Sequence, residues 1–165
     1  MKKKLAKEWP PLPHAPIAMV FGLLEHLRDA SGGREDLYKL GGPLGLELDD
    51  LLPVTEAAKQ LGLVKIASGD IELTSEGRVL AGAEAPDRKE RLRRQLFDLP
   101  LLRRIHEALE PAEGGRVLRK EFLDLLHEHF SPVEAERQLG TALDWARYGE
   151  LFDYDPDTEE FVLPS

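Results

Sequence analysis

Residues 64–73 read Val-Lys-Ile-Ala-Ser-Gly-Asp-Ile-Glu-Leu. Apolar and polar residues alternate on both sides of the Ser-Gly-Asp centre, which is typical of two short strands joined by a glycine turn. A helix is predicted directly before this hairpin, over residues 47–61, because acidic residues stand at its start and apolar residues recur at helical spacing. The residues expected on its inner face are Leu51, Leu52, Ala58 and Leu61.

Two more helices are expected upstream. The first covers residues 17–30, where apolar residues form one helical stripe and Ser31-Gly32-Gly33 ends the pattern. A short second helix is expected over residues 34–40, before Gly41-Gly42-Pro43 interrupts the chain. The resulting order of helix, helix, helix and hairpin is the winged-helix pattern.

The same order of elements returns in the second half of the chain. Apolar stripes predict helices over residues 101–109 and 118–126. Ser131-Pro132 then starts a third helix, with a capping serine followed by proline at the first helical position and Glu134 completing a capping box. Asp155-Pro156-Asp157 separates two short apolar stretches, which predicts a second hairpin.

We therefore predict a mainly α fold with small β-hairpins (α+β), built from tandem winged-helix units joined by a helical linker. Gly-Gly-Arg at residues 32–34 returns at residues 114–116, which supports the repeat. A proline-rich N-terminal tether, a first unit, a basic linker helix and a second unit are expected at residues 1–16, 17–85, 86–100 and 101–165.

Composition excludes several classes of protein. The 165 residues include no cysteine, which rules out disulfides, thiolate metal sites and a cysteine nucleophile. No apolar run approaches the roughly 20 residues of a membrane span, and no signal peptide is recognisable. We therefore expect a cytoplasmic protein without direct membrane insertion.

No catalytic, cofactor or metal site is expected. His127 and His129 flank Glu128, but residues two apart on a helix face different directions, so they cannot ligate one metal ion well. The acidic stretch from Asp153 to Glu160 lacks the ligand spacing and central glycine of a calcium loop. No arrangement of serine, histidine and acid suggests a nucleophile, so we predict that the chain is not an enzyme.

DNA binding, the common use of a winged helix, is disfavoured by charge. The formal net charge is −9, and the third helix of the first unit carries Glu47, Asp49, Asp50 and Glu56 against Lys59. The second hairpin holds five acidic residues and no basic one. These carboxylates would meet DNA phosphates at close range and repel them. A dimeric DNA-binding transcription regulator stays the alternative.

The basic linker helix offers candidate partner-contact residues. Its arginines could bind an acidic partner or a phosphate-rich ligand. The other interpretation is an ordinary solvated helix face, in which Asp87, Glu90 and Asp98 neutralise the arginine charges. The candidates are Arg88, Arg91 and Arg94 on this helix, and Arg103 and Arg104 just after it. Trp145 and Tyr148 are added as aromatic candidates, with core packing as their other interpretation.

Four stretches of the chain resemble the AAA-associated C-terminal domain family. They are Gly33 to Tyr38, Gly45 to Pro53, Gly69 to Thr74, and Leu143 to Phe152. The resemblance spans about residues 12–163. That family is appended to the ATP-binding subunits of nitrate/sulfonate/bicarbonate/taurine-type ABC importers, and the resemblance brings no catalytic residue with it.

The resemblance implies a non-catalytic accessory or regulatory domain that acts by protein–protein interaction. Its implied partner is the ABC transporter ATPase subunit. Apart from the resemblance, a second copy of the chain is the alternative partner. Binding to a transporter would place it at the inner face of the membrane. The chain contains no Gly-Lys dipeptide, so a Walker A loop is absent and the chain itself should not hydrolyse ATP. A small-molecule sensor with a pocket between the two units is a third option.

Overall fold

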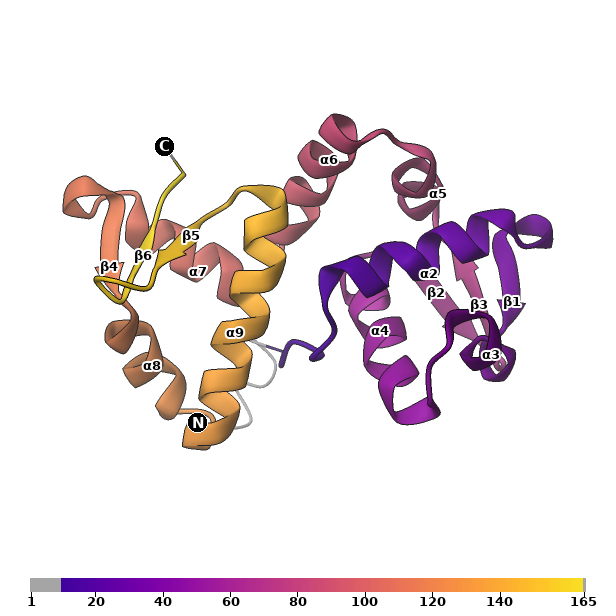
Figure 1. Cartoon of the computed structure of the whole chain (residues 1–165), viewed down its shortest axis with the longest axis horizontal. Helices are drawn as coiled ribbons and strands as arrows, with labels where there is room; N and C mark the ends of the chain where they lie inside the picture. The colour runs from indigo at the N-terminus through magenta and orange to yellow at the C-terminus, as the bar shows by residue number, and fades with distance from the viewer. Residues whose placement is uncertain (1–9, 165) are drawn as a thin grey trace. The chain divides into compact units, whose positions relative to one another are not determined.

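The computed structural model describes residues 10–164, which form two compact units. The N-terminal unit comprises residues 13–92, and the C-terminal unit comprises residues 93–164 together with residues 10–12. Helix α6 (Ala85–Phe97) carries the chain from one unit to the other (Figure 1). The division between the units therefore lies inside the helix that was predicted as a basic linker.

The N-terminal unit consists of helices around a small antiparallel sheet. Its strand order is β1-β3-β2, so the second strand of the hairpin lies in the middle. In chain order its elements are α2 (Ile17–Asp29), η1 (Ser31–Gly33), β1 (Arg34–Asp36), η2 (Leu37–Lys39), α3 (Gly41–Leu44), α4 (Leu48–Gln60), β2 (Val64–Ala67), β3 (Asp70–Leu73) and α5 (Ser75–Gly82).

The predicted hairpin is confirmed. Strand β2 pairs with β3 so that Val64 faces Leu73 and Ala67 faces Asp70. The two residues of the turn, Ser68 and Gly69, both have positive φ, at 53° and 81°. Positive φ at both positions is the turn geometry whose twist matches that of paired strands, and glycine adopts it without steric cost.

The predicted short helix over residues 34–40 is wrong. Residues 34–36 form β1, which pairs antiparallel with β3 so that Arg34 faces Glu72. A single three-ten turn, η2, follows, and the Asp36 carboxylate caps it by accepting a hydrogen bond from the Tyr38 backbone N–H at 2.8 Å. Residues 41–44, expected as an interruption, form the short helix α3. Residues 34–36 have no apolar alternation of their own, so they form a strand because they pair with the edge of β3.

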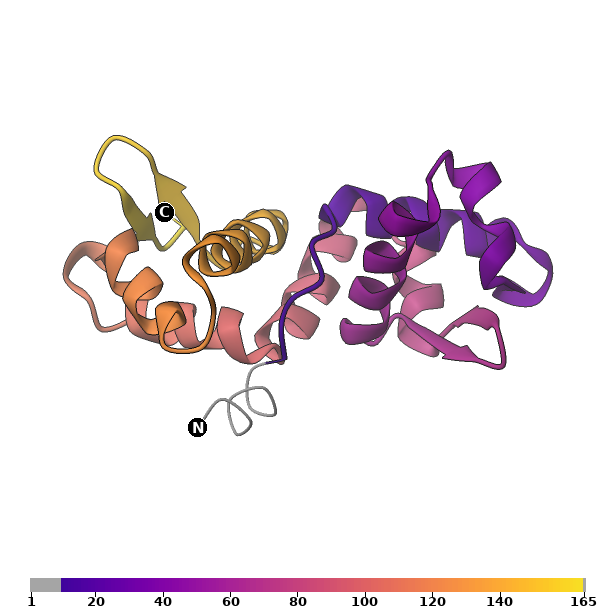
Figure 2. The ribbon, with the colours of Figure 1, turned by 90° about the horizontal axis from the view of Figure 1, so that it is seen from below.

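The C-terminal unit repeats this order of elements. Its elements are α7 (Pro100–Leu109), η3 (Glu113–Gly115), β4 (Arg116–Leu118), α8 (Arg119–His127), α9 (Pro132–Gly149), β5 (Asp153–Asp155) and β6 (Glu160–Val162). The strand order is β4-β6-β5, which matches the sheet of the first unit position by position. Figure 2 shows the β5–β6 hairpin extending beyond the helices of its unit. Leu118, expected on a helix, is the last residue of β4.

Both units contain a capped helix, and the cap in the C-terminal unit was predicted from sequence. The Ser131 hydroxyl accepts a hydrogen bond from the Glu134 backbone N–H at 3.2 Å, and Pro132 is the first residue of α9. Thr74 caps α5 in the same way through the Gly77 backbone N–H at 3.0 Å. Each cap satisfies a backbone donor that the first helical turn leaves unpaired.

Each unit buries its own apolar core. The stripe predicted on α2 is buried, as is that on α7; their members are Ile17, Val20, Phe21, Leu24, Leu27, Leu101, Leu102, Ile105 and Leu109. In the C-terminal unit Phe161 of β6 meets Phe122 and Phe152 edge to face, with ring centroids 5.4 and 5.8 Å apart. Leu52, predicted on the inner face of α4, is instead 39% exposed.

The proline-rich segment ahead of α2 is only partly described. Residues 1–9 of the predicted tether lie outside the described residues. Residues 10–16 form no helix or strand, yet Leu12 and Ala15 are 3% and 4% exposed. The described part of the segment is therefore packed against the protein.

Candidate functional site

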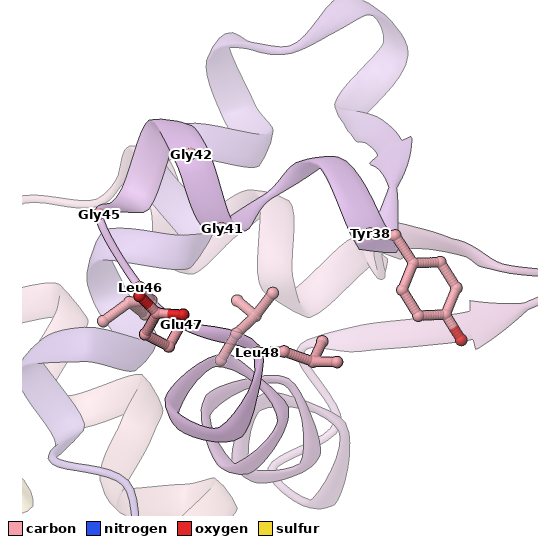
Figure 3. A pocket seen from close by; sticks show the side chains of 8 residues that line it. Tyr38, Gly41, Gly42, Gly45, Leu46, Glu47 and Leu48 are labelled. Carbon is pink, nitrogen blue, oxygen red and sulfur yellow. The ribbon is translucent and has the colours of Figure 1, made fainter.

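An open hollow of about 440 Å³ lies beside the start of α4 in the N-terminal unit. Figure 3 shows Tyr38 at one end of it, Leu46 and Glu47 at the other, and Leu48 between them. Its lining residues are Tyr38, Gly41, Gly42, Gly45, Leu46, Glu47, Leu48 and Leu51. The hollow thus brings η2, α3 and α4 to one surface.

Glycines shape the hollow. Gly45 ends α3 with φ of 67°, a left-handed conformation that favours glycine. The Leu46 backbone N–H then donates to the Gly41 carbonyl at 2.9 Å, which folds the loop back on α3. A Cβ on Gly41 would lie 2.7 Å from the Leu46 carbonyl oxygen, so this close approach requires glycine. The tight loop leaves the large side chains around it uncovered.

The surface around the hollow combines exposed apolar groups with acidic ones. Tyr38 is 71% exposed and Leu48 47% exposed, and Leu52 lies one helical turn beyond Leu48 on the same face of α4. Exposed carboxylates surround them, at Glu47, Asp49, Asp50 and Glu56. Exposed apolar groups within a polar rim are typical of protein-docking surfaces. Sequence reasoning missed Tyr38 and Leu48; the only signal was that Leu48 lies outside the buried stripe of α4.

The acidic β5–β6 hairpin is paired with a basic residue from the neighbouring strand β4. Arg116 of β4 lies 3.1 Å from the Asp155 carboxylate and 3.3 Å from that of Glu160. This guanidinium lowers the pKa of Asp155, and the pKa of Arg116 is raised in turn. Arg34 pairs with Asp70 at 2.8 Å at the matching place in the other unit. Arg34 and Arg116 are the arginines of the repeated Gly-Gly-Arg sequence, so this repeat was the sequence signal for the two ion pairs.

Arg88, a predicted contact residue, makes its contacts within the N-terminal unit. Its guanidinium donates to the Leu80 and Ala81 carbonyls, both at 3.2 Å, and lies 3.2 Å from the Glu25 carboxylate. It also lies 4.7 Å from the centroid of the Phe21 ring. Arg88 therefore caps the C-terminal end of α5 and ties it to α2.

The other candidate arginines occupy different settings. Arg91 lies 3.8 Å from Glu76 and Arg94 is exposed on α6. Arg103 and Arg104 are exposed on α7. Arg88 and Arg91 belong to the N-terminal unit, whereas Arg94, Arg103 and Arg104 belong to the C-terminal unit.

The two aromatic candidates on α9 differ in exposure. Trp145 is fully buried, at 0% exposed, and Tyr148 is half-buried. Complete burial leaves Trp145 no surface for a partner, so the prediction of a contact residue is wrong there and its alternative, core packing, holds.

A second open hollow, of about 480 Å³, lies at the end of α9 in the C-terminal unit. Arg147 and Asp153 both line it, and the Arg147 guanidinium lies 2.7 Å from the Asp153 carboxylate. This hydrogen bond lowers the pKa of the Asp153 carboxyl. The pair is a structural clamp between α9 and β5.

Two further features bear on function. Across residues 10–164, no three or more histidine and acidic side chains gather closely enough to hold a metal ion. None of the helices described there has both the length and the apolar character needed to cross a bilayer.

Comparison with known proteins gives one match. A model of the C-terminal AAA-associated domain matches residues 38–155, a range that contains the α4 hollow, α6 and most of the C-terminal unit. Neither the curated proteins nor the solved structures gave a match. The chain therefore belongs to the family of C-terminal AAA-associated domains, accessory domains of AAA-type ATPases.

Proposed function

We propose that this chain is a non-catalytic regulatory module that binds the ATPase subunit of a nitrate/sulfonate/taurine-type ABC importer. Family membership supports the association with an ATPase, and the resemblance of the four sequence stretches supports the transporter type. The module would act in the cytoplasm and reach the inner face of the membrane through the transporter complex.

We further propose that each unit is a winged-helix unit. Supporting this are the shared order of helix, strand, helices and hairpin, and the matching strand orders β1-β3-β2 and β4-β6-β5. In such a unit α4 occupies the position that DNA-binding relatives use to read bases. The same scaffold serves protein contacts when that helix presents different chemistry.

The single observation that carries the proposal is the exposed surface beside α4. Tyr38, Leu48 and Leu52 expose apolar area there, and the charged groups around them are mostly acidic. DNA would bring phosphates against these carboxylates, whereas a protein partner could cover the apolar groups and pair with the acids. The surface therefore favours a protein partner.

Regulation needs only a modest energy difference between two states of the ATPase. A module that binds one state about 1–3 kcal/mol more tightly than the other shifts their balance by roughly 5- to 150-fold. An aromatic and two leucines at the centre of an interface can supply a difference of this size, since a few buried side chains dominate most interfaces.

The test is titration of the full chain against the ATP-binding subunit of such an importer from the same organism. We expect saturable binding by calorimetry and a change in ATP turnover at saturation. A parallel titration with duplex DNA near physiological salt examines the transcription-regulator alternative. Failure to bind the subunit, together with salt-resistant binding to DNA, would reverse the assignment.

A further inference from the structure

A buried glutamine in the C-terminal unit holds a distant part of the chain by its backbone. The Leu12 N–H donates to Gln138 Oε1 at 2.8 Å, and Gln138 Nε2 donates to the Leu12 carbonyl at 3.1 Å. Both residues are almost completely buried, with Gln138 1% and Leu12 3% exposed. The glutamine side chain thus pairs with Leu12 as a neighbouring strand would.

The amide of Gln138 is also held by a residue of its own helix. Nε2 also donates to the Glu134 carboxylate at 2.8 Å, one turn earlier on α9. That bond directs the amide nitrogen toward one side and leaves Oε1 to accept the backbone donor. Helix α9 itself is capped by Ser131 and packs on α7 and α8, so its structure has support besides the Leu12 segment.

The segment around Leu12 has the chemistry of a recognised peptide. Its neighbours Pro10, Pro11 and Pro13 carry no backbone N–H, so Leu12 offers the one backbone donor among residues 10–13. Proline also restricts the backbone to extended conformations, which lowers the entropy lost on binding. Gln138 therefore fixes the register of this segment through the backbone of Leu12, and the buried Leu12 side chain adds apolar contact.

We propose that Gln138 is the centre of a binding site for an extended leucine segment flanked by prolines, and that residues 11–13 occupy it as a displaceable ligand. The attachment of the segment includes the buried Leu12 side chain and the two hydrogen bonds to Gln138, and residues 11–13 form neither helix nor strand. After Pro13 the chain turns, with the Ala15 N–H donating to the Pro13 carbonyl at 2.9 Å, and enters α2.

Displacement would alter how the two units are connected. Leu12 belongs to the C-terminal unit and Pro13 to the N-terminal unit, so the docked segment is a second connection beside α6. A partner that carries a proline-flanked leucine could therefore exchange with the segment and loosen this second connection.

The probe for this site is a labelled peptide of residues 10–16, Pro-Pro-Leu-Pro-His-Ala-Pro, added to the full chain carrying Leu12→Ala. We expect saturable binding by fluorescence anisotropy, at least tenfold weaker binding to the unmodified chain, and loss of binding when Gln138→Leu is added. The built-in segment competes at a high effective concentration, which is why the unmodified chain should bind weakly. A peptide with alanine in place of leucine is the matched control.

Absence of binding to a folded Leu12→Ala chain, or equal binding to both chains, would overturn the proposal. Hydrogen exchange in the unmodified chain gives an answer even if that variant does not fold. The Leu12 amide should exchange at least tenfold faster than the central amides of α9, and excess peptide should speed it further. Exchange of Leu12 at the same rate as the α9 core, unaffected by peptide, contradicts a displaceable segment.

Discussion

Tyr38 of η2 and Leu48 of α4 line one hollow of the N-terminal unit while exposing 71% and 47% of their surface. The glycine-rich loop between them contributes little side-chain cover. Such groups contribute little to folding, because they are already in contact with water. A partner that covers Tyr38 and Leu48 would account for their exposure. Substituting these two residues therefore tests the proposed interface directly.

The first prediction is that Tyr38→Ser and Leu48→Ser each weaken binding to the ATPase subunit by at least about tenfold, or ~1.4 kcal/mol. The stability of the chain should change little, since both side chains are exposed. Affinity is measured by calorimetry, and folding by circular dichroism and thermal unfolding.

Val133→Ser is the matched control for these two variants. Val133 is 72% exposed, as Tyr38 is, but it lies at the start of α9 in the other unit. We expect it to leave affinity unchanged. Equal losses from Val133→Ser and Tyr38→Ser would show that the hollow is not the contact surface.

Local features of this fold could be predicted from sequence because their causes are local. The Ser68-Gly69 turn and the Ser131 cap depend on residues next to them in the chain. Strand β1 could not be predicted in this way, because it exists by pairing with β3. Its own residues, Arg34 to Asp36, carry no alternating pattern.

The candidate site shows the same division. The acidic character of α4 could be predicted from the sequence. The hollow could not, because it depends on the Leu46 to Gly41 backbone hydrogen bond, which folds the loop after α3 back on that helix. Arg88 looked like one member of an exposed basic helix. In the structure Arg88 instead contacts Glu25, 63 residues away, and the end of α5. Tertiary packing brings these groups together, so the sequence alone could not reveal the contacts.

The second prediction concerns Gly77, where α5 packs against the chain just before β2. A Cβ there would lie 1.9 Å from the Leu63 carbonyl oxygen, so Gly77→Ala must push the helix away. We expect a loss of about 1–3 kcal/mol of local stability, measured by hydrogen exchange of the α5 and β2 amides. Gly140→Ala is the control: nothing lies within 4 Å of its added methyl on α9, and it should stabilise that helix by ~0.5–1 kcal/mol. Unchanged exchange in Gly77→Ala would contradict this packing.

The third prediction separates two arginines that the sequence grouped together. Arg88→Met removes the hydrogen bonds to the end of α5 and the ion pair with Glu25, so we expect a loss of about 1–3 kcal/mol. Arg103→Met, at an exposed position on α7, should stay within about 0.5 kcal/mol of the parent chain. Denaturant unfolding followed by circular dichroism measures both. Equal effects would show that Arg88 does not act as an internal clamp.

The last prediction uses the two lowered carboxyl pKa values of the C-terminal unit. Arg116 lowers the pKa of Asp155, and Arg147 lowers that of Asp153. Because the folded state binds these protons less tightly than the unfolded state, the stabilisation is present above the ordinary aspartate pKa of about 3.9 and is lost as pH falls through the lower folded values. Carboxyl NMR titrations should show Arg116→Met raising the pKa of Asp155 but not that of Asp153, and Arg147→Met raising the pKa of Asp153 but not that of Asp155. If both aspartates moved in either variant, the two clamps would not be independent.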